Sequence, residues 1–196
     1  MSILGNRVLR TEDPKFLTAG GDYVADVELP PGEVQLVFVR ATMAHARIES
    51  IDVDEARSAP GVVDVVTADD LDVDPMPPAF GMINAAMAQP YLARDVVRYV
   101  GEPVVAILAE TTAQALDAAE LVFVDLDPLP SLVDSAESNG SDNLLFPDAG
   151  TNVAMAMPSS APASFDDCEV VVRQRIVNQR VAAGPIEPRV AAAYWG

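Results

Sequence analysis

The chain has 196 residues, of which 50% are hydrophobic and 21% charged, which is enough to build a sizeable core. Its formal net charge of -18 excludes nucleic acid as a partner, because phosphate binding requires a basic patch. A single cysteine (Cys168) and a single histidine (His45) exclude an internal disulfide and any metal site that needs several cysteine or histidine ligands from this chain.

No membrane or export signal stands out in the sequence. No apolar run reaches the roughly 18 residues of a membrane-spanning helix. The first residues, MSILGNRVLRTEDPKFL, lack a basic stretch followed by an apolar segment and a cleavage site. We therefore expect a cytoplasmic protein without a membrane span.

The first half of the chain predicts short strands and one short helix after an extended arm. The arm runs to about residue 31 and ends in the turn LPPGE. Apolar, β-branched runs predict strands over 33–41, 46–53 and 62–69. One or two helical turns are expected between the second and third strands, with Asp54 as N-cap and Pro60-Gly61 as the end.

A long irregular segment comes next, over 72–95. It has several prolines and methionines and no steady hydrophobic period. It is longer than most connections in compact domains. We therefore expect it to be functional or to pack against a partner.

The clearest pattern lies over 96–134. Val104 to Leu108 reads as a buried strand, and Thr111 with Gln114 forms the capping pattern T-x-x-Q of a helix start. Ala115, Leu116 and Ala119 are expected on the buried face of that helix. The run LVFVDL then predicts a returning strand, so the chain contains two strand–helix–strand units.

The composition changes after this unit. Residues 135–165 are rich in Ser, Asn, Asp, Pro and Ala, which is typical of a linker and predicts a protease-sensitive stretch. The runs CEVVVRQRIVNQR and IEPRVAAAYW then predict new strands. Strands with an uncovered edge and apolar face invite association, so we expect a dimer or partner complex through 169–195.

The usual motifs for chemistry are absent from the sequence. It has no G-x-G-x-x-G, Walker, H-E-x-x-H or G-x-S-x-G pattern. His45 is expected to be structural or exposed, and Cys168, behind two aspartates, to be unreactive. Four aspartates could hold calcium, but their spacing is not that of an EF-hand loop, and a solvated surface is the better interpretation: Asp69, Asp70, Asp72 and Asp74.

Gly101-Glu102-Pro103 is the sharpest candidate, because it places a carboxylate among apolar residues. Such a carboxylate needs hydrogen-bond donors or a cation, and the simplest interpretation is a turn with Glu102 paired to Arg98 or to backbone amides. Glu187-Pro188-Arg189 repeats the arrangement near the C-terminus.

The stretch VRYVGEPVVAI and the residues after it closely resemble the N-terminal part of molybdenum hydroxylase large subunits, the family of xanthine dehydrogenase, aldehyde oxidase and aerobic carbon monoxide dehydrogenase. RVLRTEDPKFLTAGGDYVAD resembles the family's R-x-E-D-x-x-x-L-T-G-x-G opening, and MAHARI its A-H-A-R-I segment. NQRVAAGPIEPR resembles its Q-R-x-x-x-x-P-M-E-P-R segment, with Ile186 in place of methionine. The motifs occur in the same order and cover nearly the whole chain.

The resemblance implies an α+β fold. It implies an N-terminal arm over 1–19, an α/β hammerhead domain over 20–134, a linker over 135–165 and the truncated start of the molybdopterin-binding domain over 166–196. It also implies a molybdenum–molybdopterin cofactor in the complete enzyme, with iron–sulfur and FAD partner subunits or domains. A homodimer is the other assembly that we expect.

The family's catalytic glutamate and cofactor contacts lie beyond Gly196, so none of Glu102, Glu187 or Cys168 takes those roles. We expect no catalytic, cofactor or metal residue in this chain. It is expected to be a scaffold piece: a truncated product, an expressed fragment or one chain of a split subunit. The alternative is a free-standing hammerhead module for binding or assembly, without redox activity. The substrate class would be an aldehyde, an N-heterocycle or carbon monoxide.

Overall fold

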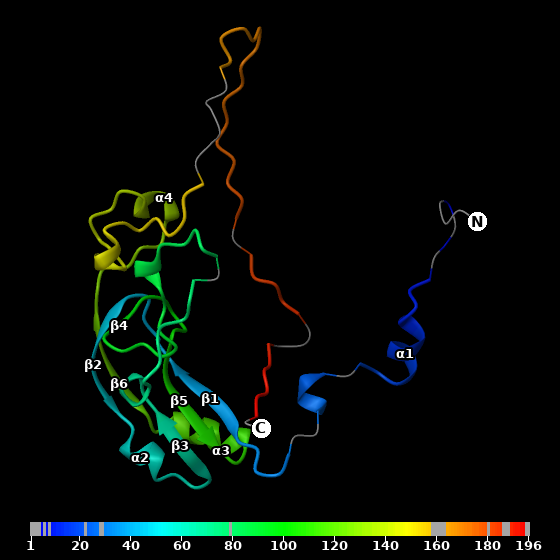
Figure 1. The fold of residues 1–196 in the computed structure, drawn as a ribbon, viewed down its shortest axis with the longest axis vertical. Coiled ribbons are helices and arrows are strands. Elements are labelled where there is room, and N and C mark those ends of the chain that lie inside the picture. The colour runs from blue at the N-terminus through cyan, green and yellow to red at the C-terminus, as the bar shows by residue number, and fades with distance from the viewer. Residues whose placement is uncertain are drawn as a thin grey trace. The chain divides into compact units, whose positions relative to one another are not determined.

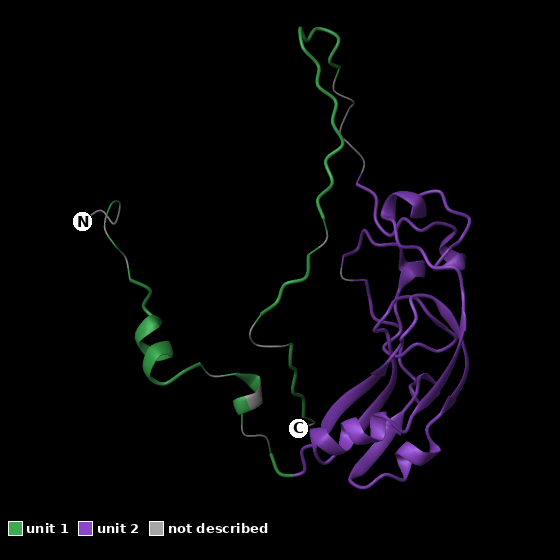
Figure 2. Cartoon of the chain, turned by 180° about the vertical axis from the view of Figure 1, so that it is seen from behind, with its two compact units in different colours: residues 1–31, 164–196 green, residues 32–163 purple. Residues whose placement is uncertain are grey.

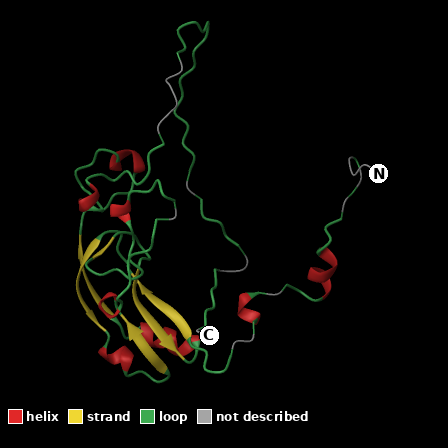
Figure 3. Cartoon of the chain, in the orientation of Figure 1, coloured by secondary structure: helices red, strands yellow, loops and turns green. Residues whose placement is uncertain are grey.

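The computed structural model describes residues 5, 7, 9–21, 23–27, 30–78, 80–157, 164–179, 181–185 and 189–194. The chain divides into two compact units, which are coloured separately in Figure 2. One consists of residues 32–163, and the other combines 1–31 with 164–196. All strands of the described residues lie in the unit formed by residues 32–163 (Figure 3).

Two three-stranded antiparallel sheets form the unit 32–163 (Figure 1). In the first sheet β5 is the central strand between β1 and β3, and the strands are β1 (Gln35–Arg40), β3 (Val62–Val66) and β5 (Pro103–Ala109). In the second sheet β2 is central between β4 and β6, and the strands are β2 (Ala46–Asp52), β4 (Val96–Val97) and β6 (Phe123–Pro128). Five of these strands fall where the sequence predicted strands, whereas β4 was not predicted.

Register in both sheets follows the burial of apolar side chains. Val37 of β1 is opposite Ile107 of β5, and Ile107 is also opposite Val65 of β3. Because β5 is covered on both faces, it reads as a continuous apolar run, PVVAILA, and most of its residues are buried. In the second sheet Ile48 of β2 is opposite Leu126 of β6.

The helices of this unit are short. They comprise α2 (Asp54–Arg57), α3 (Thr112–Ala119) and α4 (Ser135–Ser138), with the 3-10 turns η2 (Ala68–Asp70), η3 (Ala85–Met87) and η4 (Pro147–Ala149). Helix α3 contacts all three strands of the first sheet and also α2. Thr111 is its N-cap and its side chain accepts a bond from the Gln114 amide at 3.3 Å, as predicted.

Two details of the helices differ from the sequence-based prediction. The N-cap of α2 is Val53, and Asp54 is its first helical residue; the Asp52 side chain accepts the Asp54 amide at 3.1 Å. On α3 the buried residues are Ala115 and Ala118, whereas Leu116 is 53% exposed. Alanines let the helix approach the sheet closely, and this leaves the larger leucine at the margin of the contact.

The main core joins both sheets and both of the helices α2 and α3. Its fully buried residues include the largest side chains of the interior: Val65, Val97, Val104, Val105 and Ile107. A smaller cluster of Ala68, Leu92 and Ala106 lies beside it. Leu92 comes from the long segment 72–95, in which Met87 and Ala93 are also buried. That segment therefore packs on its own domain.

The segment expected to be a linker is partly folded. Residues 135–157 belong to the same compact unit as the sheets and contain α4 and η4. Asn152 holds this segment together: its side chain accepts the Leu145 amide at 3.1 Å and donates to the carbonyls of Ser138 at 3.2 Å and Asn143 at 2.8 Å. The composition of this segment gives no sign of these side-chain bonds, so the sequence did not predict that it folds.

The other unit contains the helix α1 (Asp13–Thr18) and the 3-10 turn η1 (Val24–Asp26). The described parts of 168–194 contain no helix or strand, so the strands predicted after Cys168 are absent from them. Strands exist only where a neighbouring strand supplies hydrogen bonds, and the described residues here pair with none. Residues 186–188 and 195–196 lie outside the described residues.

Candidate functional site

The Gly101-Glu102-Pro103 motif forms a tight turn between β4 and β5. Gly101 has φ of 91°, a left-handed conformation that favours glycine. The turn is bound to residue Ala41 by two backbone bonds of 2.8 Å, from the Gly101 amide to the Ala41 carbonyl and from the Ala41 amide to the Glu102 carbonyl. Arg40 adds a third, from Nη1 to the Gly101 carbonyl at 2.8 Å. The turn is therefore fixed on several sides.

Glu102 points into this turn and is only 3% exposed. Its Oε2 accepts the backbone N–H of Arg98, and the Tyr99 backbone also bonds the carboxylate. Burial raises the pKa of Glu102, while these amides and the charges of Arg98 and His45 act in the opposite direction. The structure thus agrees with the interpretation of Glu102 as a turn residue held by backbone amides.

The Arg98 side chain extends from the same turn to a distant part of the chain. Its Nε donates to the Leu145 carbonyl at 2.8 Å, and its guanidinium lies over the Phe146 ring, 4.5 Å from the centroid. Nη1 also donates to the Val96 carbonyl at 3.2 Å. The side chain joins the turn before β5 to the segment after α4, a partnership that the sequence does not reveal.

His45 has a structural place beside this turn. It is 7% exposed, and its Nδ1 lies 2.7 Å from the Pro130 carbonyl oxygen. A carbonyl only accepts, so Nδ1 carries the proton. Asn143 Nδ2 donates to the same carbonyl at 2.8 Å. The Pro130 carbonyl therefore connects a buried histidine to the segment 135–157, which agrees with the structural role expected for His45.

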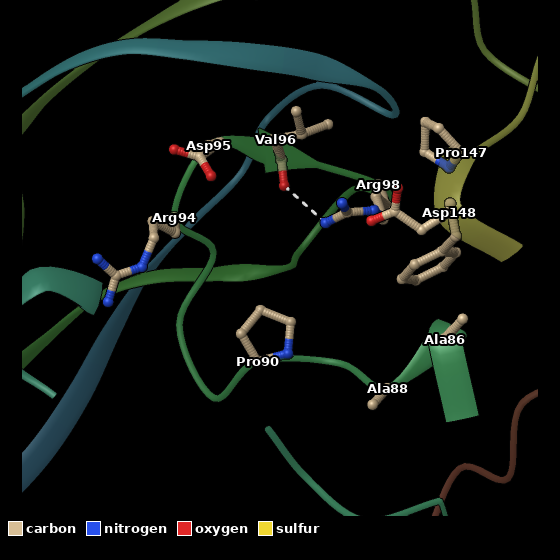
Figure 4. Close-up of a pocket in the computed structure, with 10 residues that line it drawn as sticks. Ala86, Ala88, Pro90, Arg94, Asp95, Val96, Arg98, Pro147 and Asp148 are labelled. Carbon is tan, nitrogen blue, oxygen red and sulfur yellow. Dashed lines mark hydrogen bonds between the residues drawn. The ribbon is translucent and has the colours of Figure 1, made fainter. Parts of the chain in front are cut away.

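A cavity of about 280 Å³ opens between residues 146–148 and the loop before β4 (Figure 4). Its lining carries charges of both signs and consists of Ala86, Ala88, Pro90, Arg94, Asp95, Val96, Arg98, Phe146, Pro147 and Asp148. Figure 4 shows the Arg94 guanidinium turned away from Arg98. It bonds instead to Asp69 and, at 2.5 Å, to the Ala68 carbonyl. A second cavity of about 260 Å³ lies beside β2 and η2.

The remaining candidates do not gather into a site. Asp69 pairs with Arg94, and Asp70 accepts from Thr67 and lies 3.6 Å from Arg57. The described residues contain no group of three or more His, Cys, Asp or Glu side chains able to hold a metal ion. Cys168 is exposed in the other unit.

Glu187 and Pro188 lie outside the described residues, while Arg189 is exposed and outside any helix or strand. The His45 ring bonds to a backbone carbonyl rather than to a hydroxyl or thiol that it could activate. The buried polar groups, His45 and Glu102, thus bond to backbone atoms and stabilise a turn and a packed segment. The arrangement in the described residues is that of a scaffold with small surface cavities.

The comparisons with known proteins agree with this fold. Residues 18–130 match the sequence family described as the a/b hammerhead domain of aldehyde oxidase and xanthine dehydrogenase. The 6-hydroxypseudooxynicotine dehydrogenase complex subunit gamma of Paenarthrobacter nicotinovorans is 37% identical over 95% of this chain and 24% of its own length. The carbon monoxide dehydrogenase large chain of Afipia carboxidovorans is 33% identical over 94% of this chain and 24% of its own.

A solved structure shares the arrangement of the elements. The reconstituted CO dehydrogenase from Oligotropha carboxidovorans aligns with 70% of this chain and 17% of its own, at 40% identity and a TM-score of 0.60. The two antiparallel sheets with their small helices are therefore a hammerhead fold. The chain belongs to the aldehyde oxidase and xanthine dehydrogenase hammerhead family.

The match is to part of a larger protein in each case. The chain spans about a quarter of the length of the curated relatives that it matches over most of its residues. Among the residues that the structure describes, no helix is both long and apolar enough to cross a bilayer.

Proposed function

We propose that this chain supplies the hammerhead scaffold of a molybdenum-cofactor oxidoreductase large subunit and is not catalytic by itself. The family match over 18–130 carries the proposal, because it coincides with a domain whose buried polar groups serve structure. The relatives that match over nearly the whole chain are named as a dehydrogenase complex subunit and a carbon monoxide dehydrogenase large chain.

The described residues supply no metal-ligating group of their own. The two cavities described above are lined by neither a cysteine nor a histidine. We therefore assign no step of the reaction to this chain. In this proposal the cofactor and the substrate are held by other parts of the large subunit, and iron–sulfur and FAD subunits are the electron-transfer partners.

The assembled protein would be cytoplasmic, with a substrate among aldehydes, N-heterocycles and carbon monoxide. The chain would divide into an arm, a hammerhead domain and a later part that joins the molybdopterin-binding region. The motif Glu187-Pro188-Arg189 would belong to that later part. Glu102, with Gly101 and Pro103, would shape the domain.

A free-standing binding or assembly module is the second candidate. The observation in its favour is the self-contained core of the unit 32–163, which is closed by its own two sheets and helices. The residues of this core are buried by the unit itself, without contacts from a larger protein.

Native mass spectrometry of the full chain, recovered with a mild affinity tag after expression with its genomic neighbours, separates the two. Molybdenum and iron are measured in the same sample. Recovery in an assembly that contains molybdenum supports the scaffold role. Recovery as a single 20.7 kDa chain without these metals, while the neighbouring proteins are present and folded, contradicts it.

A further inference from the structure

We propose that residues 135–157, which we call the strap, form a detachable wall of the 280 Å³ cavity, that Arg98 fastens the strap, and that Glu102 is the positioning residue for Arg98. Such a conformational device belongs to the domain itself and is independent of the proposed function.

The strap is folded by its own hydrogen bonds. The Asn152 side chain makes three bonds within it, and the Asp134 side chain caps α4 by accepting the Ala136 amide at 2.6 Å. None of its residues is fully buried. A segment with internal bonds and no buried side chain separates from a core at low cost, as local opening units do.

Few described bonds fasten the strap to the rest of the domain. Arg98 Nε donates to the Leu145 carbonyl at 2.8 Å, the Asn84 amide donates to the Ala154 carbonyl at 2.9 Å, and Asn143 donates to the Pro130 carbonyl at 2.8 Å. Only the Arg98 bond comes from a charged donor, and only Arg98 also stacks on a strap ring. Charged donors make the stronger hydrogen bonds, so Arg98 is the main fastening.

Glu102 acts on the strap through Arg98. Its described hydrogen bonds go to the backbone of Arg98, Tyr99 and Ala41, and none goes to the strap. By holding the Arg98 amide, the carboxylate fixes the backbone from which the guanidinium extends. Loss of the carboxylate therefore leaves the Arg98 side chain without a fixed orientation. Glu102 has this effect although none of its described bonds goes to the strap.

Release of the strap changes the cavity. Phe146, Pro147 and Asp148 form the strap side of its lining, and the other side consists of residues 86–98 (Figure 4). Without the strap this side becomes an open surface.

Hydrogen exchange of the full chain, followed by mass spectrometry, tests the fastening. Arg98→Ala is compared with the unchanged chain and with Arg47→Ala, an exposed arginine of β2 that lies 3.9 Å from Glu49. We expect strap amides to exchange roughly tenfold faster or more in Arg98→Ala, as for the loss of a charged hydrogen bond. Amides of β5 and β2 should keep their protection, and Arg47→Ala should match the unchanged chain.

Two further variants test the positioning role and guard against unfolding. Glu102→Ala should also speed strap exchange, whereas Glu102→Gln, whose amide oxygen still accepts the Arg98 N–H, should restore protection. Arg98→Lys keeps the charge but loses the Nε donor and the planar stack, so it should also free the strap. It replaces Arg98→Ala as the test variant if Arg98→Ala unfolds the domain.

Unchanged strap exchange in both Arg98 variants, with β5 still protected, overturns the proposal. So does a loss of strap and β5 protection together in Arg98→Lys, because the strap would then belong to the core.

Discussion

The guanidinium of Arg98 lies 4.5 Å from the centroid of the Phe146 ring and so binds the turn after β4 to a residue that comes after β5, α3 and β6 in the chain. Such a contact contributes about 0.5–1 kcal/mol where it is exposed to water. Together with the neighbouring bond to the Leu145 carbonyl, it fixes where the segment after α4 lies on the domain.

Glu102→Gln should raise the free energy of unfolding at neutral pH. Burial raises the pKa of Glu102 above 4.5, so the folded state binds its proton more tightly than the unfolded state. The stability that this group contributes is present below pH 4.5 and is lost as the pH rises through the raised pKa. The neutral glutamine side chain carries no charge to bury, so the variant avoids this loss of stability. Its oxygen still accepts the backbone N–H of Arg98.

Urea denaturation at a series of pH values measures the effect. The difference in free energy of unfolding between Glu102→Gln and the unchanged chain should grow as the pH rises from below 4.5 towards neutral. Glu49→Gln, at an exposed position of β2, serves as the control and should show no such growth. A difference that is constant over this range would contradict the role of burial.

Ile107→Ala should lower the free energy of unfolding by about 2–5 kcal/mol, because it leaves a cavity at a fully buried position of β5. Leu116→Ala is the control: Leu116 is on α3 but half exposed, and its removal should change the free energy by less than about 0.5 kcal/mol. Guanidinium denaturation of both variants measures the two values. A larger loss for Leu116→Ala would mean that α3 buries a different face.

Gly61→Ala should destabilise the domain by about 1–2 kcal/mol. Gly61 has φ of 76°, and an added Cβ would meet the side chain of Gln114. Gly81→Ala is the matched control, because nothing lies within 4 Å of its added Cβ. Thermal unfolding of the pair reads out the difference, and equal melting temperatures would refute the strain at Gly61.

Thr111→Ala should cost about 1 kcal/mol, because the Gln114 amide loses its acceptor at the start of α3. Thr111→Ser retains the hydroxyl and should recover most of this loss. Urea midpoints of the two variants test the cap. If both variants lose the same amount, the methyl group and not the oxygen stabilises the helix start.

The strands of the domain could be predicted from the sequence because their apolar runs have a strand's length and composition. Residues of β5 such as Val105 and Ile107 form a continuous apolar stretch that only burial on both faces permits. The cap at Thr111 was predicted for an equally local reason, since donor and acceptor are three residues apart.

Other features depend on partners that are distant in the sequence. The Arg98–Phe146 contact, the Asn152 bonds and the closure of the segment 135–157 on the domain join residues that no local pattern connects. The buried face of α3 was predicted wrongly at Leu116 because hydrophobicity favours a leucine, whereas the close approach to the sheet favours Ala118. The strands predicted after Cys168 lacked a partner strand among the described residues.

The sheet order has a consequence for how the domain folds. In the described residues no strand pairs with its immediate successor: β1 and β3 pair with β5, and β2 pairs with β4 and β6. Every sheet contact therefore closes a long loop first, and such topologies fold in milliseconds to seconds, without a quick hairpin to begin from. During synthesis the second sheet is complete only after β6 has left the ribosome. Until then Ile48 and Ile51 of β2 lack their partner strand, in which Leu126 and Val124 lie opposite them, and they can form non-native contacts.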